Sequence, residues 1–131
     1  MKIHLYEKPR VFHIKEGNVT ISDYGKINLE PNELVSFRTP SGSECDFVAK
    51  EWGFYPTSSP NNRMKKEGFK TALVRNKNNK IQLNVVEEDK MDLYKSYLLS
   101  HYVPLKIVCW LDELDASQLD AIENALKKGE K

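Results

Sequence analysis

The sequence predicts an α+β fold, a mostly antiparallel β-meander or a small sandwich or barrel with two helices. Apolar and polar residues alternate through most of the chain, and glycine, asparagine and proline interrupt the alternation at short intervals. After Glu88 the apolar spacing becomes helical, which predicts a C-terminal strand-helix-strand-helix unit. A chain of 131 residues suits a single domain over residues 1–131, because two independent domains would each be too small to bury a stable core.

The first third of the chain is predicted to form half-buried antiparallel strands. Ile3 and Leu5 alternate with polar neighbours, as the residues of a strand with one covered face do. Residues 11–15 and 19–22 then flank Glu16-Gly17-Asn18, a turn sequence suited to a hairpin. We therefore expect these segments to pair with one another and to bury their apolar sides.

Three further turn sequences divide the strands that follow. The first lies at residues 23–26, and the second, Pro40-Ser41-Gly42-Ser43, separates the strand-like runs 34–39 and 44–48. The third, at residues 76–79, is rich in asparagine and lies between two more alternating segments. Each of these turns indicates a reversal of the chain between antiparallel strands.

The helical spacing after Glu88 predicts an amphipathic helix over residues 89–101. Its apolar face is formed by Met91, Tyr94 and Leu98, with Tyr97 adjacent. A nearly continuous apolar run follows Pro104, and such a run is typical of a strand that is covered on both faces.

We expect this run, Leu105 to Leu111, to form a central strand with Val108, Cys109 or Trp110 among the most buried residues. The order strand, helix, strand predicts a right-handed crossover that places it parallel to the Ile81 strand or nearby.

A last helix is predicted over residues 117–128. Ser117 suits the N-cap position, and the sequence Lys127-Lys128-Gly129 suits a C-terminus. We expect this helix to bury Leu119, Ile122 and Leu126, which share one face.

Composition excludes several classes of protein. Charged residues make up 30% of the chain but the net charge is only +1, so no global field favours nucleic acid or an anionic membrane. No apolar run approaches the length of a membrane span, and the first residues lack a signal-peptide pattern, so we expect a cytoplasmic protein. Cys45 and Cys109 have no CxxC spacing or neighbouring histidines, which predicts reduced thiols, no metal site and no cofactor.

The segment from Trp52 to Arg63, called the aromatic loop below, is the candidate functional site. Trp52, Phe54 and Tyr55 surround one glycine, and a stretch of proline, threonine, serine and asparagine follows that cannot bury a core of its own. One interpretation places Trp52 and Phe54 in the core, at the end of a strand. The other makes the loop a binding surface whose ring face, amides and guanidinium suit sugar hydroxyls and a carboxylate. The predicted ligand-binding residues are Trp52, Tyr55, Asn61, Asn62, Arg63 and Arg75.

Basic residues are concentrated between Arg63 and Lys80, where seven cationic side chains accompany only Glu67. Such a stretch beside the aromatic loop could attract a phosphate, a nucleotide-sugar or an acidic sugar. The alternative is that the lysines are a solvated edge that keeps a hairpin from pairing with other sheets.

A pattern of aromatic residues and glycines resembles small uncharacterised bacterial proteins. These are encoded among genes for surface polysaccharide and for nonulosonic, sialic-acid-like sugars. The resemblance covers roughly the middle two thirds of the chain. It implies a setting in the metabolism of glycan precursors, and it implies no active site. The residues that carry it are Lys50-Glu51-Trp52-Gly53-Phe54-Tyr55, Thr57, Asn62-Arg63, Gly68-Phe69-Lys70, Ala72-Leu73-Val74, Val86-Glu87-Glu88 and Val108-Cys109-Trp110-Leu111-Asp112.

Three functions from different classes stay open at this point. The first is a non-catalytic accessory protein of surface-glycan metabolism that binds an anionic sugar or sugar nucleotide through the aromatic loop. The second is a small isomerase or hydrolase acting on a sugar nucleotide, with catalytic residues unknown and the Glu44/Asp46 pair or a histidine as candidates. The third is a protein-interaction or oligomerisation module, for which a homodimer is one form. A large exposed aromatic patch favours the third, and a deep pocket with convergent polar groups favours the first two.

Overall fold

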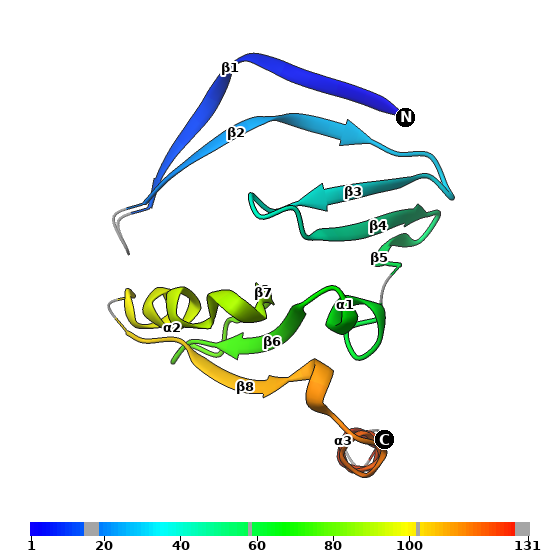
Figure 1. Cartoon of the computed structure of the whole chain (residues 1–131), viewed down its shortest axis with the longest axis vertical. Helices are drawn as coiled ribbons and strands as arrows, with labels where there is room; N and C mark the ends of the chain where they lie inside the picture. Colours follow the sequence, from blue (N-terminus) through cyan, green and yellow to red (C-terminus); the bar gives the residue numbers. More distant parts are fainter. Residues whose placement is uncertain (15–18, 58, 102, 128–131) are drawn as a thin grey trace.

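The computed structural model describes residues 1–14, 19–57, 59–101 and 103–127, and confirms an α+β fold (Figure 1). Its strands form three open antiparallel sheets with the orders β1-β2, β3-β4-β5 and β7-β6-β8, so the barrel that the sequence allowed is not formed. None of the described helices is long and apolar enough to cross a membrane. The strands are β1 Lys2–Ile14, β2 Val19–Asn28, β3 Leu34–Arg38, β4 Glu44–Lys50, β5 Gly53–Pro56, β6 Phe69–Arg75, β7 Ile81–Glu87 and β8 Lys106–Trp110, and the α-helices are α1 Arg63–Lys66, α2 Met91–Leu99 and α3 Ala116–Lys127.

The middle sheet follows the predicted hairpin. β3 pairs with β4 in a register that sets Phe37 against Cys45, and the predicted turn at residues 40–43 joins the two strands. β5 pairs with the other edge of β4. Gly53 opens β5 with a φ of 144°, a conformation that side-chain-bearing residues rarely adopt, so the tight reversal after β4 depends on this glycine.

In the third sheet the central strand is β6, and the prediction that the Leu105 to Leu111 segment is central was wrong. β8 pairs only with β6 and lies at the edge of the sheet. The register shifts between Leu73 and Val74, which leaves Val108 without a paired position and 53% exposed. Because β7 and β8 are both antiparallel to β6, they run parallel to each other with β6 between them.

The main core lies between this sheet and α2. The helix that was predicted over residues 89–101 covers Met91 to Leu99, after a 3-10 turn at Glu88–Lys90. Its buried residues are Tyr94 and Leu98, whereas Tyr97 stays exposed. The core cluster comprises Ala72, Val74, Val86, Tyr94, Leu98 and Leu105.

A smaller cluster joins the middle sheet to the third sheet. Cys45 of β4, Met64 of α1 and Phe69 of β6 are buried together, with Phe47 packed against them. Near them, the Thr39 hydroxyl donates a hydrogen bond to Glu87 Oε1 at 2.8 Å, across the two sheets. The middle sheet is therefore fastened to the third sheet by apolar and polar contacts.

The first two strands form a ribbon, called the arm below, that lies above β3 at one end of the long axis (Figure 1). The predicted turn at residues 16–18 lies outside the described residues. The predicted turn at residues 23–26 is absent, because β2 continues through it with an irregular register opposite Leu5 to Arg10. The prediction that these strands are half-buried was wrong, since the apolar residues of the arm are exposed.

Helix α3 lies at the opposite end of the long axis (Figure 1). It begins earlier than predicted, because Asp115 and not Ser117 caps it: Asp115 Oδ1 accepts the Gln118 N–H at 2.8 Å and Gln118 Oε1 accepts the Asp115 N–H at 3.0 Å. The expected burial of its apolar face was also wrong, since the helix has no buried residue. Its apolar side chains Leu119, Ile122 and Leu126 are 43%, 43% and 69% exposed.

Candidate functional site

The aromatic residues of the aromatic loop lie on the surface. Trp52 is 73% exposed and Phe54 is 66% exposed, so the interpretation that places them in the core was wrong. The Trp52 and Tyr55 rings stack with centroids 5.9 Å apart and planes inclined by 17°. Pairing of β5 with β4 holds Phe54 and Tyr55 in extended backbone, which turns successive side chains to opposite faces.

The polar residues of the aromatic loop surround the start of α1. Asn61, Asn62 and Arg63 are exposed, and the buried side chain of Met64 anchors the short helix. Arg63 Nη2 lies 3.4 Å from Asp46 Oδ2, and the Asp46 side chain is only 11% exposed. Arg63 is therefore already close to a carboxylate of its own chain. The other oxygen, Asp46 Oδ1, is buried without a hydrogen-bond partner among the described residues.

The predicted ligand-binding residues do not converge on one cavity. Trp52 lines a shallow depression of about 260 Å³ together with Pro31, Asn32, Lys50 and Glu51. Arg75 lines a different one, of about 140 Å³, whose other residues are Asn76, Lys77, Asn79, Val103, Pro104 and Lys106. Tyr55, Asn61, Asn62 and Arg63 line neither of these depressions.

Part of the predicted basic stretch has a structural role. Lys70 Nζ lies 3.0 Å from Asp112 Oδ2 and 3.3 Å from Glu113 Oε1, and 5.0 Å from the centre of the Trp110 ring. Burial acts to lower the pKa of Lys70, but the hydrogen bonds that its ammonium donates to the two carboxylates outweigh this effect and raise the pKa. Asp112 also accepts the Thr71 N–H at 2.9 Å. This lysine therefore joins β6 to the segment after β8 and is not free to bind an anion.

The candidate catalytic groups are dispersed. Cys45 and Cys109 are free thiols on different sheets, and burial raises the pKa of the Cys45 thiol, which makes it less reactive. His13 lies on the arm, in a different sheet from Cys45 and Asp46. Within the described ranges, no group of three or more histidine, cysteine, aspartate or glutamate side chains is placed to hold a metal ion.

The outer half of the arm has one apolar face. Phe12 pairs with Ile21 and Ile14 pairs with Val19, and paired residues of an antiparallel ribbon point to the same side. All four are between 43% and 51% exposed. The neighbouring positions on the opposite face include His13, Thr20 and Ser22.

The inner half of the arm repeats this arrangement. Ile3 pairs with Ile27, and Leu5 points to the same side opposite Gly25. These apolar side chains are also exposed, Leu5 by 73%. The two halves of the ribbon thus present apolar side chains that the described part of the chain leaves largely uncovered.

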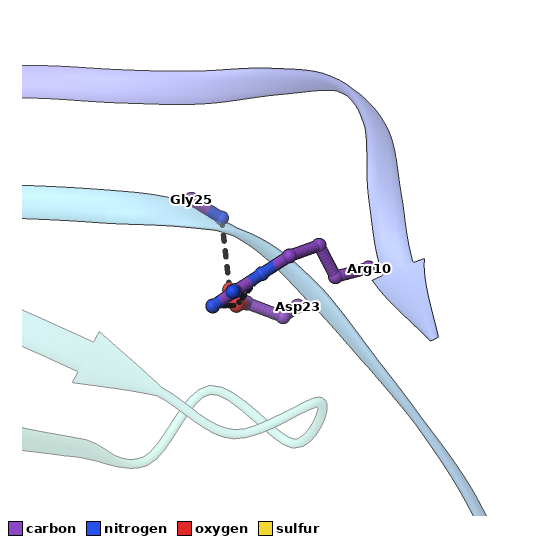
Figure 2. Close-up of polar contacts among 3 residues, drawn as sticks. All are labelled: Arg10, Asp23 and Gly25. Carbon is purple, nitrogen blue, oxygen red and sulfur yellow. Dashed lines mark hydrogen bonds and ion pairs between the residues drawn. The ribbon is translucent and has the colours of Figure 1, made fainter. Parts of the chain in front are cut away.

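A polar cluster fastens the arm where its register changes (Figure 2). Arg10 Nε and Nη2 donate to Asp23 Oδ2 at 3.0 and 2.5 Å, and Asp23 Oδ1 accepts the Gly25 N–H at 3.1 Å. The hydrogen bond from Arg10 is the main cause that lowers the pKa of Asp23, followed by the bond from Gly25. The Arg10 guanidinium, the Asp23 carboxylate and the Gly25 N–H therefore link β1 to β2 at the junction between the two halves of the arm.

The accessible surface of the chain is large for its mass. A compact monomer of 15.2 kDa exposes about 7,100 Å². This chain exposes 10355 Å², which is roughly 3,200 Å² more than that scaling gives. The arm and α3, whose apolar side chains are exposed at the two ends of the molecule, contribute to this excess.

The sequence interpretation missed the arm as a functional element. The length of β1, 13 residues where strands of globular proteins usually have about 3 to 10, became visible only in the structure, because the sequence predicted shorter separate segments. The alternation of apolar and polar residues was read correctly as a strand pattern. It does not tell whether the apolar face is covered by the same chain or by another.

Comparison with known proteins found no relative: no protein-family model matches the chain, and neither a curated protein nor a solved structure shows significant similarity to it.

Proposed function

We propose that this protein is a protein-interaction module and that the arm is its docking element. The observation that carries the proposal is the uncovered apolar face of the arm, formed in its outer half by Phe12, Ile14, Val19 and Ile21. An exposed apolar area of this kind on a well-formed element is typical of a surface that binds another protein.

The regular pairing of the arm supports the same proposal. A two-stranded ribbon in water is marginally stable at best, since it has no third strand or helix to pack against. The arm nevertheless has paired residues in both halves, from Lys2 to Leu5 and from Arg10 to Ile14, and a specific polar cluster at its change of register. A partner that covers the apolar face supplies the burial that the ribbon lacks on its own.

Site-specific crosslinking in the organism that encodes the chain tests this function. A photo-crosslinking phenylalanine analogue is placed at position 12 on the apolar face or, as the matched control, at position 22 on the opposite face. We expect a covalent adduct with another polypeptide from position 12 and little from position 22, because only the first position is buried by the partner. Equal yields from the two positions, or no adduct from either, would contradict the proposal.

A second candidate function is the binding of an anionic sugar or sugar nucleotide by the aromatic loop. The observation that favours it is the exposed stack of Trp52 on Tyr55 beside a depression that contains Asn32 and Lys50. Exposed aromatic rings cover the apolar faces of sugars, while amide and ammonium groups bind hydroxyls and acidic groups. The glycan setting implied by the sequence resemblance is consistent with this ligand.

Calorimetric titration tests the second candidate. N-acetylneuraminate and a uridine diphosphate sugar are titrated into the wild type and into Arg63→Ala. If Arg63 holds the acidic group, we expect the variant to lose about 1.5 to 3 kcal/mol of binding free energy, and Arg63→Lys to restore only part of it. Absence of heat with both ligands would count against this candidate, and equal affinities of wild type and Arg63→Ala would show that Arg63 takes no part in binding.

A further inference from the structure

We infer that the partner of the arm is a second copy of this chain, and that the arm of each copy packs on helix α3 of the other. This inference rests on the proposed function and names the partner and the surface that receives the arm. It follows from the geometry of α3, from the charges of the two surfaces and from the area that each chain leaves exposed.

Helix α3 offers an apolar surface that is already formed. Leu119, Ile122 and Leu126 follow the spacing of one helical face, and all three are exposed. The reciprocal hydrogen bonds between Asp115 and Gln118 cap the helix and fix its first turn. An amphipathic helix of this length is marginal in water without a covering partner, so its apolar face calls for the same kind of contact as the arm.

The charges of the two surfaces are complementary. The arm carries the cationic side chains Lys2, Lys8, Arg10 and Lys26 against the two carboxylates Glu7 and Asp23. The described residues of α3 and its cap carry the carboxylates Asp115, Asp120 and Glu123 against Lys127. The opposite net charges of the two elements favour their encounter.

Strand β7 also exposes apolar side chains, but the charges near it argue against β7 as the surface that receives the arm. Ile81, Leu83 and Val85 of β7 are exposed on one face, and this face could in principle accept a ribbon. The turn that precedes β7 carries Lys77 and Lys80, which would repel the cationic arm. The acidic helix is therefore the better match.

The exposed area favours a second copy over a different protein. The excess of roughly 3,200 Å² for one chain is about four times the roughly 800 Å² that each partner buries in a standard interface, so it leaves room for a contact at each end of the molecule. A different protein that covered only the arm would leave the apolar face of α3 exposed. Because the arm and α3 lie at opposite ends of one chain, two copies related by a two-fold axis can cover both surfaces in both chains.

Sedimentation velocity of the purified full-length chain tests the partner. We expect a species of twice 15.2 kDa, and we expect Leu119→Ser/Ile122→Ser to shift the equilibrium to monomer at least tenfold. Leu93→Ser is the control, because Leu93 is an exposed leucine on α2, outside the proposed interface, and this variant should remain dimeric.

A charge exchange tests the contact between the arm and α3. Asp120→Lys/Glu123→Lys and Lys8→Glu/Lys26→Glu should each weaken self-association at least tenfold, because each places like charges opposite one another. An equimolar mixture of the two variants should form a mixed dimer, because both of its arm-to-helix contacts then have opposite charges: the unchanged arm meets the unchanged helix, and the reversed arm meets the reversed helix. Native mass spectrometry distinguishes the mixed dimer after one variant is labelled with nitrogen-15.

The results separate the inference from the proposed function. A wild type that stays monomeric while circular dichroism shows it folded overturns the second copy as partner. The proposed function then still stands if position 12 crosslinks to another protein, and falls with the inference if it crosslinks to none. A dimer that is unaffected by Leu119→Ser/Ile122→Ser and by both charge variants overturns the contact between the arm and α3.

Discussion

At the scale of single residues, the side chains with the clearest roles are those whose polar groups lie between elements. Arg63 approaches the buried carboxylate of Asp46 from the surface, and Lys70 joins Asp112 and Glu113 beneath Trp110. Both residues belong to the basic stretch between Arg63 and Lys80, which the sequence analysis considered for binding an anionic ligand. Lys70 is bound within the fold, whereas Arg63 keeps 60% of its side chain exposed and can still meet a ligand.

The stability of Arg63→Ala must be measured alongside its affinity for sugars. Removal of the guanidinium leaves the nearly buried Asp46 carboxylate without its cation, which we expect to lower the free energy of unfolding by about 1 to 3 kcal/mol. Asp46→Asn in the same chain should recover part of this loss, because the neutral amide needs no cation. Lys66→Ala, an exposed change in the same short helix, is the control for urea unfolding.

Tyr94 predicts a specific dependence of stability on alkaline pH. Its hydroxyl donates to Asn84 Oδ1 at 2.8 Å, and burial, with a smaller effect of Tyr97, raises the pKa of Tyr94 to about 12. An unfolded tyrosine titrates near pH 10, so the folded state holds this proton more tightly. The contribution to the free energy of unfolding is therefore complete below about pH 10 and is lost as the pH rises towards about 12.

Urea unfolding between pH 9 and pH 12 measures this effect. We expect the wild type to lose about 2 to 3 kcal/mol more over this range than Tyr94→Phe, which has no phenol to ionise at that position. Tyr24→Phe, a change at an exposed tyrosine of the arm, should follow the wild type. If the free energies of unfolding of wild type and Tyr94→Phe changed in parallel with pH, burial would not be raising the pKa of Tyr94.

At the scale of elements, the arm and the body of the protein behave as separate units. The body consists of two sheets and α2, and its two clusters of buried side chains include no residue of the arm. The arm has its own pairing and its own polar cluster. A substitution can therefore disturb the arm without reaching the core.

Gly25→Ala is predicted to disrupt the arm selectively. Gly25 has a φ of 148°, and a Cβ at this position would lie 2.1 Å from the His4 carbonyl oxygen, on the paired strand. The backbones must therefore separate, and we expect amide hydrogen exchange to quicken along the arm while the amides of Ala72 and Val74 keep their protection.

The matched control is Gly42→Ala. Gly42 also has a positive φ, of 92°, but a Cβ there meets nothing within 4 Å, so only the backbone conformation is penalised. We expect Gly42→Ala to leave the rate of amide hydrogen exchange in the arm unchanged. Unaltered protection of the arm in Gly25→Ala would mean that the close approach of the two strands is not needed for pairing.

At the scale of the whole molecule, the protein is unusually open. Exposed apolar side chains lie at both ends of the long axis, on the arm and on α3, and the two sheets between them carry the core and expose further apolar side chains on β7 and the aromatic loop (Figure 1). This distribution is unfavourable for an isolated monomer, because exposed apolar surface costs free energy in proportion to its area. The exposed apolar faces of the arm and α3 are the reason why we propose that the protein functions by assembly and not through a cavity.

The local elements of this protein follow from its sequence alone. The hairpins around residues 40–43 and 76–79, the amphipathic α2 and the strand β8 were all predicted, because turn chemistry and apolar spacing are local properties of the chain. The α+β class followed from the same patterns. The polar residues before Arg63 were recognised as a loop for the same reason, whereas the sequence left open whether Trp52 and Phe54 lie in the core or on the surface.

Only the tertiary structure decided which apolar faces are covered. The alternation in β1 and β2 and the helical spacing in α3 require a partner surface for each, but burial is a relation between distant segments that periodicity does not encode. The same holds for β8, whose apolar run resembles a central strand although it pairs on one edge only. The arm and α3 have apolar faces that the described part of their own chain does not bury, and the physical reason is that their covering surface belongs, in our proposal, to a second copy.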